Sequence, residues 1–536
     1  VRQQVLFSDK EYNTFGTAAV SKQQAGLGLD IGDVVHARDY FLDKAYRAES
    51  GRQAFYESCF TAVDEIQTYF QEMEGKTFQS ALEDFKKAFQ KLAKDPSDSV
   101  RQNLVVQKAG LFLSRSQSVY EGLKSYQSNI NTKVSQDIDK INKLGHKIHE
   151  LNQQISKIEA GGIETAMDLR DERDLALDQL GALAKISYKE DYKGVVTVKL
   201  EDEYFVDELH TYEIGKKTDK LTGFITPYWP QLSDTDRDIY VNVFDFNVDI
   251  STALNSDVGE LKALIMSRGD HWADYSDIEG KGEQEYLDTT NLSVIIDMQA
   301  KLDQMVHNMI TAINDQLCPN VTGPVGVTYQ DANGNTLNLS DAKVLDTENC
   351  ARGSDGELPP RELFVRAGIE RYTEVTGSDG KTYYVYNEED TSDTSYMYSL
   401  TSCGVNEELK KIETLFPHLK QNGEVDQQLG ERLEALWNKD LVGLDPTDPD
   451  ECNIEEYYQK MIGGLATVGN VYQKKAENLA GSVLTIENNR QQVIGVSSDE
   501  ELQNMIKFQN AYNASSRFMT VISDMIEHIV TRLGNG

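Results

Sequence analysis

Apolar residues near the C-terminal end of the chain repeat with the spacing of a coiled-coil helix. Steps of three and four residues between positions 499 and 533 fall on Met505, Phe508, Tyr512, Ser515, Met519, Ile522, Ile526, Ile529 and Leu533. All of these except Ser515 are apolar or aromatic, and a second apolar line beginning at Leu502 widens the face beyond a two-helix seam. Each large apolar side chain left in water forgoes about 1.5–3 kcal/mol, so we expect this helix to pack on a partner. Leu502 and the apolar members of the repeat are therefore the predicted assembly interface.

Helical spacing also dominates the region that follows an N-terminal stretch of polar residues and turns. The stretch, residues 1–28, is expected to be an extended arm, with a short strand at 28–35. One helix is predicted over 37–74. A second begins near Phe78 and ends at Asp95-Pro96, because proline cannot continue a helix.

A third helix of about 60 residues is predicted from Ser97 to the glycine pair at Gly161, and Thr165–Leu183 is expected to return along it. Ser97 or Asp98 can cap its first turn, since their side-chain oxygens accept hydrogen bonds from backbone N–H groups. The later half of the helix repeats apolar residues at heptad spacing, with Asp137 as an exception at one seam position.

The period changes to two in the middle of the chain, which predicts β-strands. Val195–Val198 and Tyr240–Ile250 alternate in this way, and a change of phase within the second segment predicts a bulge. A second β-rich region follows at 321–398, with hairpin turns expected at Asn333-Gly334 and Asp379-Gly380.

Helical spacing returns around these strands. It predicts helices at 259–266, 292–317 and 406–437, and a helix that resumes at Ile454 and reaches the chain end after a break at 494–498.

Helices at both ends and strands between them predict an α+β multidomain protein, in which both chain ends form a long-helix, coiled-coil bundle with inserted β-rich domains. The expected segments are an extended arm (1–30), the N-terminal half of the helical bundle (31–185), an inserted β domain (186–258), helices returning to the bundle (259–320), a second, variable β-rich domain (321–453), the C-terminal half of the bundle (454–497) and the C-terminal assembly helix (498–536).

Composition excludes several classes of partner. The 536 residues carry a formal net charge of −35, which disfavours nucleic acids and anionic membranes because phosphate binding depends on clustered lysine and arginine. No run of 18 apolar residues exists, so no transmembrane helix is predicted. We therefore expect neither a nucleic acid nor a membrane as partner.

The five cysteines are scattered without a CxxC pair. Buried free thiols are the favoured interpretation. If a disulfide forms, Cys318–Cys350 is the first candidate.

Two short patterns resemble metal sites. His146-x-x-His149-Glu150 places two imidazoles on one helical turn, but it lacks the H-E-x-x-H order and a third ligand nearby. Asp234-x-Asp236-x-Asp238 resembles the start of a calcium loop, but Ile239 stands where the turn glycine is needed, so an acidic turn is expected. No catalytic, cofactor or metal residue is assigned, and the protein is not expected to be an enzyme.

Five separate segments resemble one family, the flagellar hook-associated protein 1 family of hook–filament junction proteins, and they follow the family's order. They are 26–50 (GLGLDIGDVVHARDYFLDKAYRAES), 95–110 (DPSDSVRQNLVVQKAG), 151–183, 259–268 (GELKALIMSR) and 488–525, which ends IKFQNAYNASSRFMTVISDM. The third contains DLRDERDLALDQL, similar to the family's D-L-x-D-x-R-D-x-x-L. Residues 271–285 and about 321–453 match no known pattern.

The resemblance implies a non-enzymatic building block of the flagellum, located outside the cell at the hook–filament junction. Such proteins are exported from the cytoplasm by the flagellar type III apparatus, with a cytoplasmic chaperone bound to the C-terminal region. The implied partners are the hook protein, the second hook-associated junction protein and further subunits of the same ring.

The resemblance also implies a family helix before Val1 that packs on the C-terminal helix. Alternatives remain at this level: another flagellar axial protein (the hook protein or the second junction protein), a secreted coiled-coil adhesin or carbohydrate-binding protein, and a metallohydrolase using His146 and His149.

Overall fold

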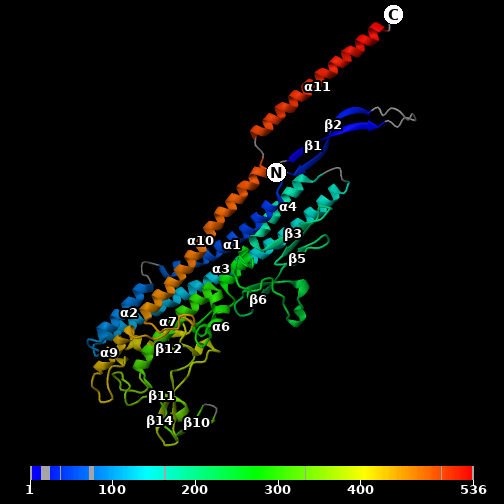
Figure 1. Cartoon of the computed structure of the whole chain (residues 1–536). Coiled ribbons are helices and arrows are strands. Elements are labelled where there is room, and N and C mark those ends of the chain that lie inside the picture. The colour runs from blue at the N-terminus through cyan, green and yellow to red at the C-terminus, as the bar shows by residue number, and fades with distance from the viewer. Residues whose placement is uncertain are drawn as a thin grey trace.

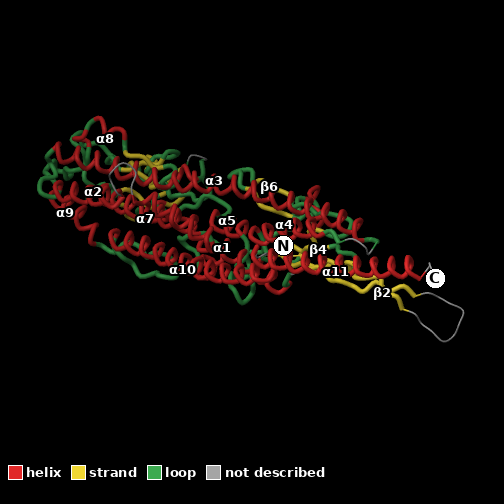
Figure 2. The backbone as a smooth tube through the Cα atoms, turned by 90° about the horizontal axis from the view of Figure 1, so that it is seen from above, coloured by secondary structure: helices red, strands yellow, loops and turns green. Residues whose placement is uncertain are grey.

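The computed structural model describes residues 3–13, 24–36, 38–71, 78–161, 165–331, 334–495 and 498–533. It is elongated, and α1 (Tyr40–Gln71), α3 (Ser99–Glu159) and α10 (Ile454–Ile494) run along its length (Figures 1 and 2). Sheets of the second β-rich region gather at one end (Figure 1). The last helix, α11 (Ser498–Leu533), extends beyond the opposite end.

The long helices form the body of the molecule. Shorter members of the bundle are α2 (Phe78–Leu92), α4 (Met167–Leu183), α5 (Glu260–Arg268) and α7 (Val294–Leu317). Asp98 caps α3, because its side chain accepts a hydrogen bond from the Val100 N–H. The α3 of 61 residues confirms the predicted long helix.

The heptad seam of α3 is buried, as its spacing predicts. Four residues of the repeat have no exposed surface: Val134, Ile141, Ile148 and Ile155. Toward the other end of α3, the ring of Phe112 lies 5.6 Å from that of Phe85 on α2, centroid to centroid. One continuous apolar core therefore runs along much of the helix.

Small antiparallel sheets occupy the middle of the chain. The first group is β3 (Ile186–Glu190), β4 (Val196–Leu200) and β5 (Glu203–Val206), followed by the pair β6 (Gly215–Thr218) and β7 (Ile225–Tyr228). The second group has a four-stranded sheet in the order β13 (Tyr372–Thr376), β14 (Thr382–Tyr386), β11 (Lys343–Leu345), β8 (Asn320–Thr322), and the pairs β9 (Thr328–Gln330) with β10 (Thr336–Asn338) and β12 (Phe364–Arg366) with β15 (Cys403–Val405). The remaining helices are α6 (Glu283–Asp288), α8 (Glu407–Lys411) and α9 (Gln427–Ala435).

Both predicted hairpin turns lie between paired strands. Gly334 and Gly380 have positive φ angles of 81° and 78°, a conformation that glycine adopts without strain. Gly334 lies between β9 and β10, whereas Asn333 lies outside the described residues, and the second turn connects β13 to β14.

The strand predicted at 28–35 is confirmed, but the stretch before it is not a separate arm without strand pairing. Instead, β1 (Gln3–Asn13) pairs with β2 (Gln24–His36) in a long antiparallel hairpin. The register shifts between Leu6 and Phe7 and between Asp9 and Glu11, and such bulges interrupt the alternation by which a strand is recognised.

Two further predicted elements were wrong. Tyr240–Ile250 is not a strand: its pairing is limited to a bridge between Tyr228 and Asn242, and Asp245 turns the chain by accepting the Asn247 N–H. The expected helix over 406–437 is divided into α8 and α9, because Pro417 and a turn at Gly423 (φ 83°) interrupt it.

All five cysteines are buried free thiols. This confirms the favoured interpretation, and the candidate Cys318–Cys350 disulfide is not formed. Among the described residues, no helix is apolar enough over a sufficient length to cross a membrane.

Candidate assembly interface

The helix α11 exposes its apolar face along its whole length. Every residue from Ser498 to Thr531 is exposed except Asn504, which is partly buried. The predicted interface residues with a described side chain are Leu502, Met505, Phe508, Tyr512, Met519, Ile522, Ile526 and Ile529, and they are between 36% and 75% exposed. The side chain of Leu533 lies outside the described residues. A row of large apolar side chains on one helix face is thus presented to solvent.

The second apolar line adds to this face. Ile506, Phe518, Val521 and Met525 are each between 48% and 66% exposed. The helix that carries both lines begins just beyond Gly495, which ends α10 as the break at 494–498 predicts. How α10 is fixed to the bundle therefore determines where the chain leaves the body before α11.

Along its middle part, α10 packs against α1. Tyr472, Ala476 and Leu479 contact the buried cluster around Phe55 and Tyr56. Close approach is required nearby, since a Cβ atom on Gly469 would lie 2.8 Å from a methyl group of Val63. The two helices are consequently held side by side by apolar packing.

Near its end, α10 is fixed by ion pairs through Arg490. Its Nε donates to Asp43 of α1 at 2.8 Å, and its Nη2 donates to Asp178 of α4 at 2.8 Å. The guanidinium also lies 4.2 Å from the ring centroid of Tyr46. Arg490 is 5% exposed, so one buried cation joins three helices.

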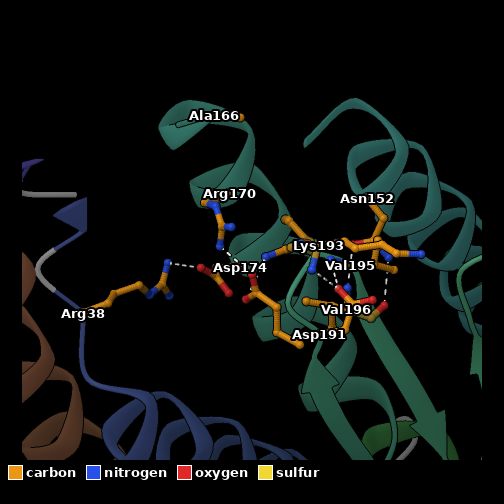
Figure 3. Close-up of polar contacts among 12 residues, drawn as sticks. Arg38, Asn152, Ala166, Arg170, Asp174, Asp191, Lys193, Val195 and Val196 are labelled. Carbon is orange, nitrogen blue, oxygen red and sulfur yellow. Dashed lines mark hydrogen bonds and ion pairs between the residues drawn. The ribbon is translucent and has the colours of Figure 1, made fainter. Parts of the chain in front are cut away.

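Two arginines from the start of the bundle complete this arrangement. Arg38 pairs with Asp43 at 2.7 Å and with Asp174 at 2.6 Å, and Figure 3 shows the contact to Asp174. Arg47 pairs with Asp178 at 2.6 Å and with Asp174 at 3.1 Å. We call Arg38, Asp43, Arg47, Asp174, Asp178 and Arg490 the α1–α4–α10 ion-pair cluster.

The cluster pairs three arginines with three aspartates. Burial acts to raise the pKa of Asp43, but Arg38, Arg490 and Arg47 outweigh it, so that the pKa lies below its usual range. Burial disfavours the charged form of Arg490, yet Asp178, Asp43 and Glu487 raise its pKa. These shifts favour the charged forms of Asp43 and Arg490, whose ion pair connects α10 to α1.

The opposite side of α4 is tied to the first inserted sheet. Arg170 donates to Glu159 at the end of α3 and to Glu190 on β3. Arg173, which is 2% exposed, donates to Asn152 of α3 and to the carbonyl of Gly194. The residues of the DLRDERDLALD segment thus connect α4 to both the bundle and the sheet.

The side chains of the two candidate metal patterns interact with other groups of the protein. His146 Nε2 lies 2.6 Å from Glu213, and His149 Nδ1 lies 3.3 Å from the carbonyl oxygen of Asp207. Asp234 caps a short turn by accepting the N–H of Arg237, as expected for an acidic turn. Across the described part of the chain, no group of three or more histidine, cysteine or acidic side chains is arranged to hold a metal ion.

Sequence reasoning identified the exposed face of α11 but missed the ion-pair cluster that fixes the end of α10. The signal was present in the spacing of Asp171, Asp174 and Asp178, which lie on one face of a helix at intervals of three and four. Their partners lie more than 120 residues away along the chain, which only the fold brings together.

The family model described as the flagellar hook-associated protein FlgK helical domain matches residues 63–326. A second, the flagellar basal body rod FlgEFG protein C-terminal, matches residues 491–532, which include most of α11. Flagellar hook-associated protein 1 of Bacillus subtilis is 23% identical over 100% of this chain and 92% of its own length. The protein of the same name from Salmonella typhimurium is 18% identical over 94% of this chain and 90% of its own.

Among solved structures, the fold is similar to that of the flagellar hook junction protein FlgK from Burkholderia pseudomallei. The TM-score is 0.50 at 12% sequence identity, with 84% of this chain and 100% of that chain covered. The long-helix body, the exposed terminal helix and the match at residues 491–532 define an axial structural protein of the bacterial flagellum. Within that class, the chain is similar along its length to flagellar hook-associated protein 1, and its residues 63–326 match the helical-domain model of that family.

Proposed function

We propose that this protein forms the junction between hook and filament and that filament assembly requires it. The observation that carries the proposal is the geometry of α11: a long helix with two lines of exposed apolar residues, which follows a helix, α10, that is fixed to the bundle by Arg490. Such a face is stable only when another helix covers it. In an axial assembly the covering surfaces are supplied by neighbouring subunits.

The apolar face is the proposed assembly site. Its residues are Leu502, Met505, Phe508, Tyr512, Met519, Ile522, Ile526, Ile529 and Leu533. Further copies of this chain in a ring, the hook protein and the second hook-associated junction protein are the proposed partners. A cytoplasmic chaperone is proposed to cover the same C-terminal region before export, because an exposed apolar helix otherwise favours aggregation.

The inserted β-rich domains are proposed to project outward from the junction. In the structure, the sheet of β13, β14, β11 and β8 lies at the end of the molecule away from α11 (Figure 1). This arrangement leaves the helical body available for lateral packing.

Deletion of the gene tests the proposed function. We expect cells that retain hooks but lack filaments, and that regain filaments and swimming when the wild-type gene is supplied in trans. Electron microscopy of the cell surface and a soft-agar motility assay give the readouts. A deletion strain with normal filaments and normal motility would contradict the proposal. Labelling of the protein anywhere other than the distal end of the hook would also contradict it.

A further inference from the structure

A cavity of about 510 Å³ lies where the first inserted region meets α5 and α7. Phe244 and Phe246 line it from the inserted region, and Met266 and Ile296 line it from the two helices. Three cationic side chains, Arg268, His271 and Lys281, belong to the same wall. An apolar cavity of this size with a few converging polar groups has the composition of a small-molecule site.

Arg268 is the unusual member of the wall. It is 1% exposed, and its Nε and Nη1 donate to the carbonyl oxygens of Gly269 and Ile225 and to the side chain of Asn131. The ring of Phe224 lies 4.7 Å from the guanidinium carbon. Within the described residues, Nη2 donates no hydrogen bond and no carboxylate forms an ion pair with Arg268.

The charge of this guanidinium is maintained in spite of its burial. Desolvation lowers the pKa of Arg268 to about 10, which is still well above neutral pH. The carboxylate of Asp270 partly offsets this cost without forming a direct ion pair, so an anion that enters the cavity would further stabilise the charge. The free Nη2 donor supplies the hydrogen bond for it.

The other two cations of the wall already have acidic partners. His271 lies 2.6 Å from Asp270 and 3.1 Å from Asp277, and Lys281 lies 3.1 Å from Asp277. Exposed carboxylates at Asp270 and Asp288 also stand at the wall of the cavity. They disfavour ligands with two or more negative charges, so the site is suited to a single one.

We propose that this cavity binds a small monocarboxylate with an apolar body. Its carboxylate pairs with Arg268, and its apolar part packs against Phe244, Met266 and Ile296. The proposal concerns a ligand site in the body of the molecule and is independent of the assembly role of α11.

Calorimetric titration of the full chain with 3-phenylpropionate tests the site, with the uncharged 3-phenylpropionamide as the comparison ligand. We expect the carboxylate to bind at least tenfold more tightly than the amide, because only the carboxylate pairs with Arg268. Equal binding of the two, or no heat of binding for the carboxylate at millimolar concentration, would overturn the proposal.

Two variants locate the binding. Asn242→Trp places a large ring into the cavity from an exposed lining position and should abolish binding. Asn247→Trp, at an exposed position outside the cavity, is the matched control and should bind like the wild type. Retained binding in Asn242→Trp, with circular dichroism confirming that both variants are folded, would place the ligand elsewhere and refute the assignment.

Discussion

The carboxyl group of Asp137 lies on the buried seam of α3, where the heptad repeat otherwise has apolar residues. The residue is 7% exposed, and its Oδ2 has no hydrogen-bond partner among the described residues. Burial and the nearby carboxylate of Glu260 raise its pKa to about 6, against the opposing effect of Lys133 and Lys140. The folded protein therefore binds this proton more tightly than the unfolded chain does.

The sign of the pH dependence follows from this difference. Because the pKa of Asp137 is higher in the folded state, its contribution favours folding at low pH and is lost as the pH rises from about 4 through about 6. At neutral pH the fold holds a buried carboxylate that would be more stable in water.

Asp137→Asn should stabilise the protein at pH 7 by on the order of 1–3 kcal/mol, because it removes the charge and keeps the shape. At pH 4 the gain should be small, since the folded wild-type carboxyl is then protonated. Urea unfolding at both pH values measures the difference. The control is Asp139→Asn, an exposed carboxylate on the same helix that pairs with Lys216, which should change stability by less than about 1 kcal/mol at either pH. An equal gain for Asp137→Asn at both pH values would contradict the account.

At the scale of elements, α10 is held by two different means. Its middle packs on α1 through apolar contacts, whereas its last turns are fixed by Arg490 to Asp43 and Asp178. Apolar packing tolerates small sliding of a helix, but a guanidinium bonded to two carboxylates fixes position and direction. The ion-pair cluster is therefore suited to fixing the end of α10, after which α11 follows.

Arg490→Gln should loosen the end of α10 while the rest of the bundle stays folded. Removing one member of a buried ion pair costs about 3–5 kcal/mol, and the remaining pairs of Arg38 and Arg47 with these aspartates place the expected loss at the lower end of that range. Hydrogen exchange measured by mass spectrometry should show faster exchange over residues 480–494. Lys474→Gln, which removes an exposed cation from the same helix, is the control and should leave exchange unchanged. Unaltered protection at 480–494 in Arg490→Gln would show that the cluster does not fix this segment.

The extent to which the elements could be predicted depends on how local their determinants are. The long helices follow from repeats within one segment, so α3 and α11 were predicted nearly to their ends. The hairpin of β1 and β2 and the turn at Asp245 were not, because bulges and side-chain hydrogen bonds disturb the alternation that defines a strand. The ion-pair cluster was missed for a different reason: its members come from three helices, and nothing in their separate sequences pairs them.

At the scale of the whole molecule, the proposed assembly helix and the second β-rich region lie at opposite ends. Both α11 and the hairpin of β1 and β2 extend beyond one end of the body, and the small sheets of the second β-rich region lie at the other (Figures 1 and 2). The bundle between them contains a continuous apolar core of its own. A change on α11 should therefore alter assembly without altering the folding of the body.

Ile522→Asp combined with Ile526→Asp tests this separation. The two residues are 36% and 55% exposed on the apolar face of α11, so charges there cost the isolated fold little. Buried between subunits, however, each unpaired carboxylate would carry a penalty of several kcal/mol. We expect the variant to fail to restore filaments in the deletion strain, while its thermal unfolding transition stays within about 2 °C of the wild type. Thr520→Asp combined with Thr531→Asp adds the same charges on the opposite face of the helix and should restore filaments, because that face is polar. If the first variant lost the thermal transition of the bundle, α11 would belong to the core of the folded body, and if both variants restored filaments, the apolar face would not be the assembly site.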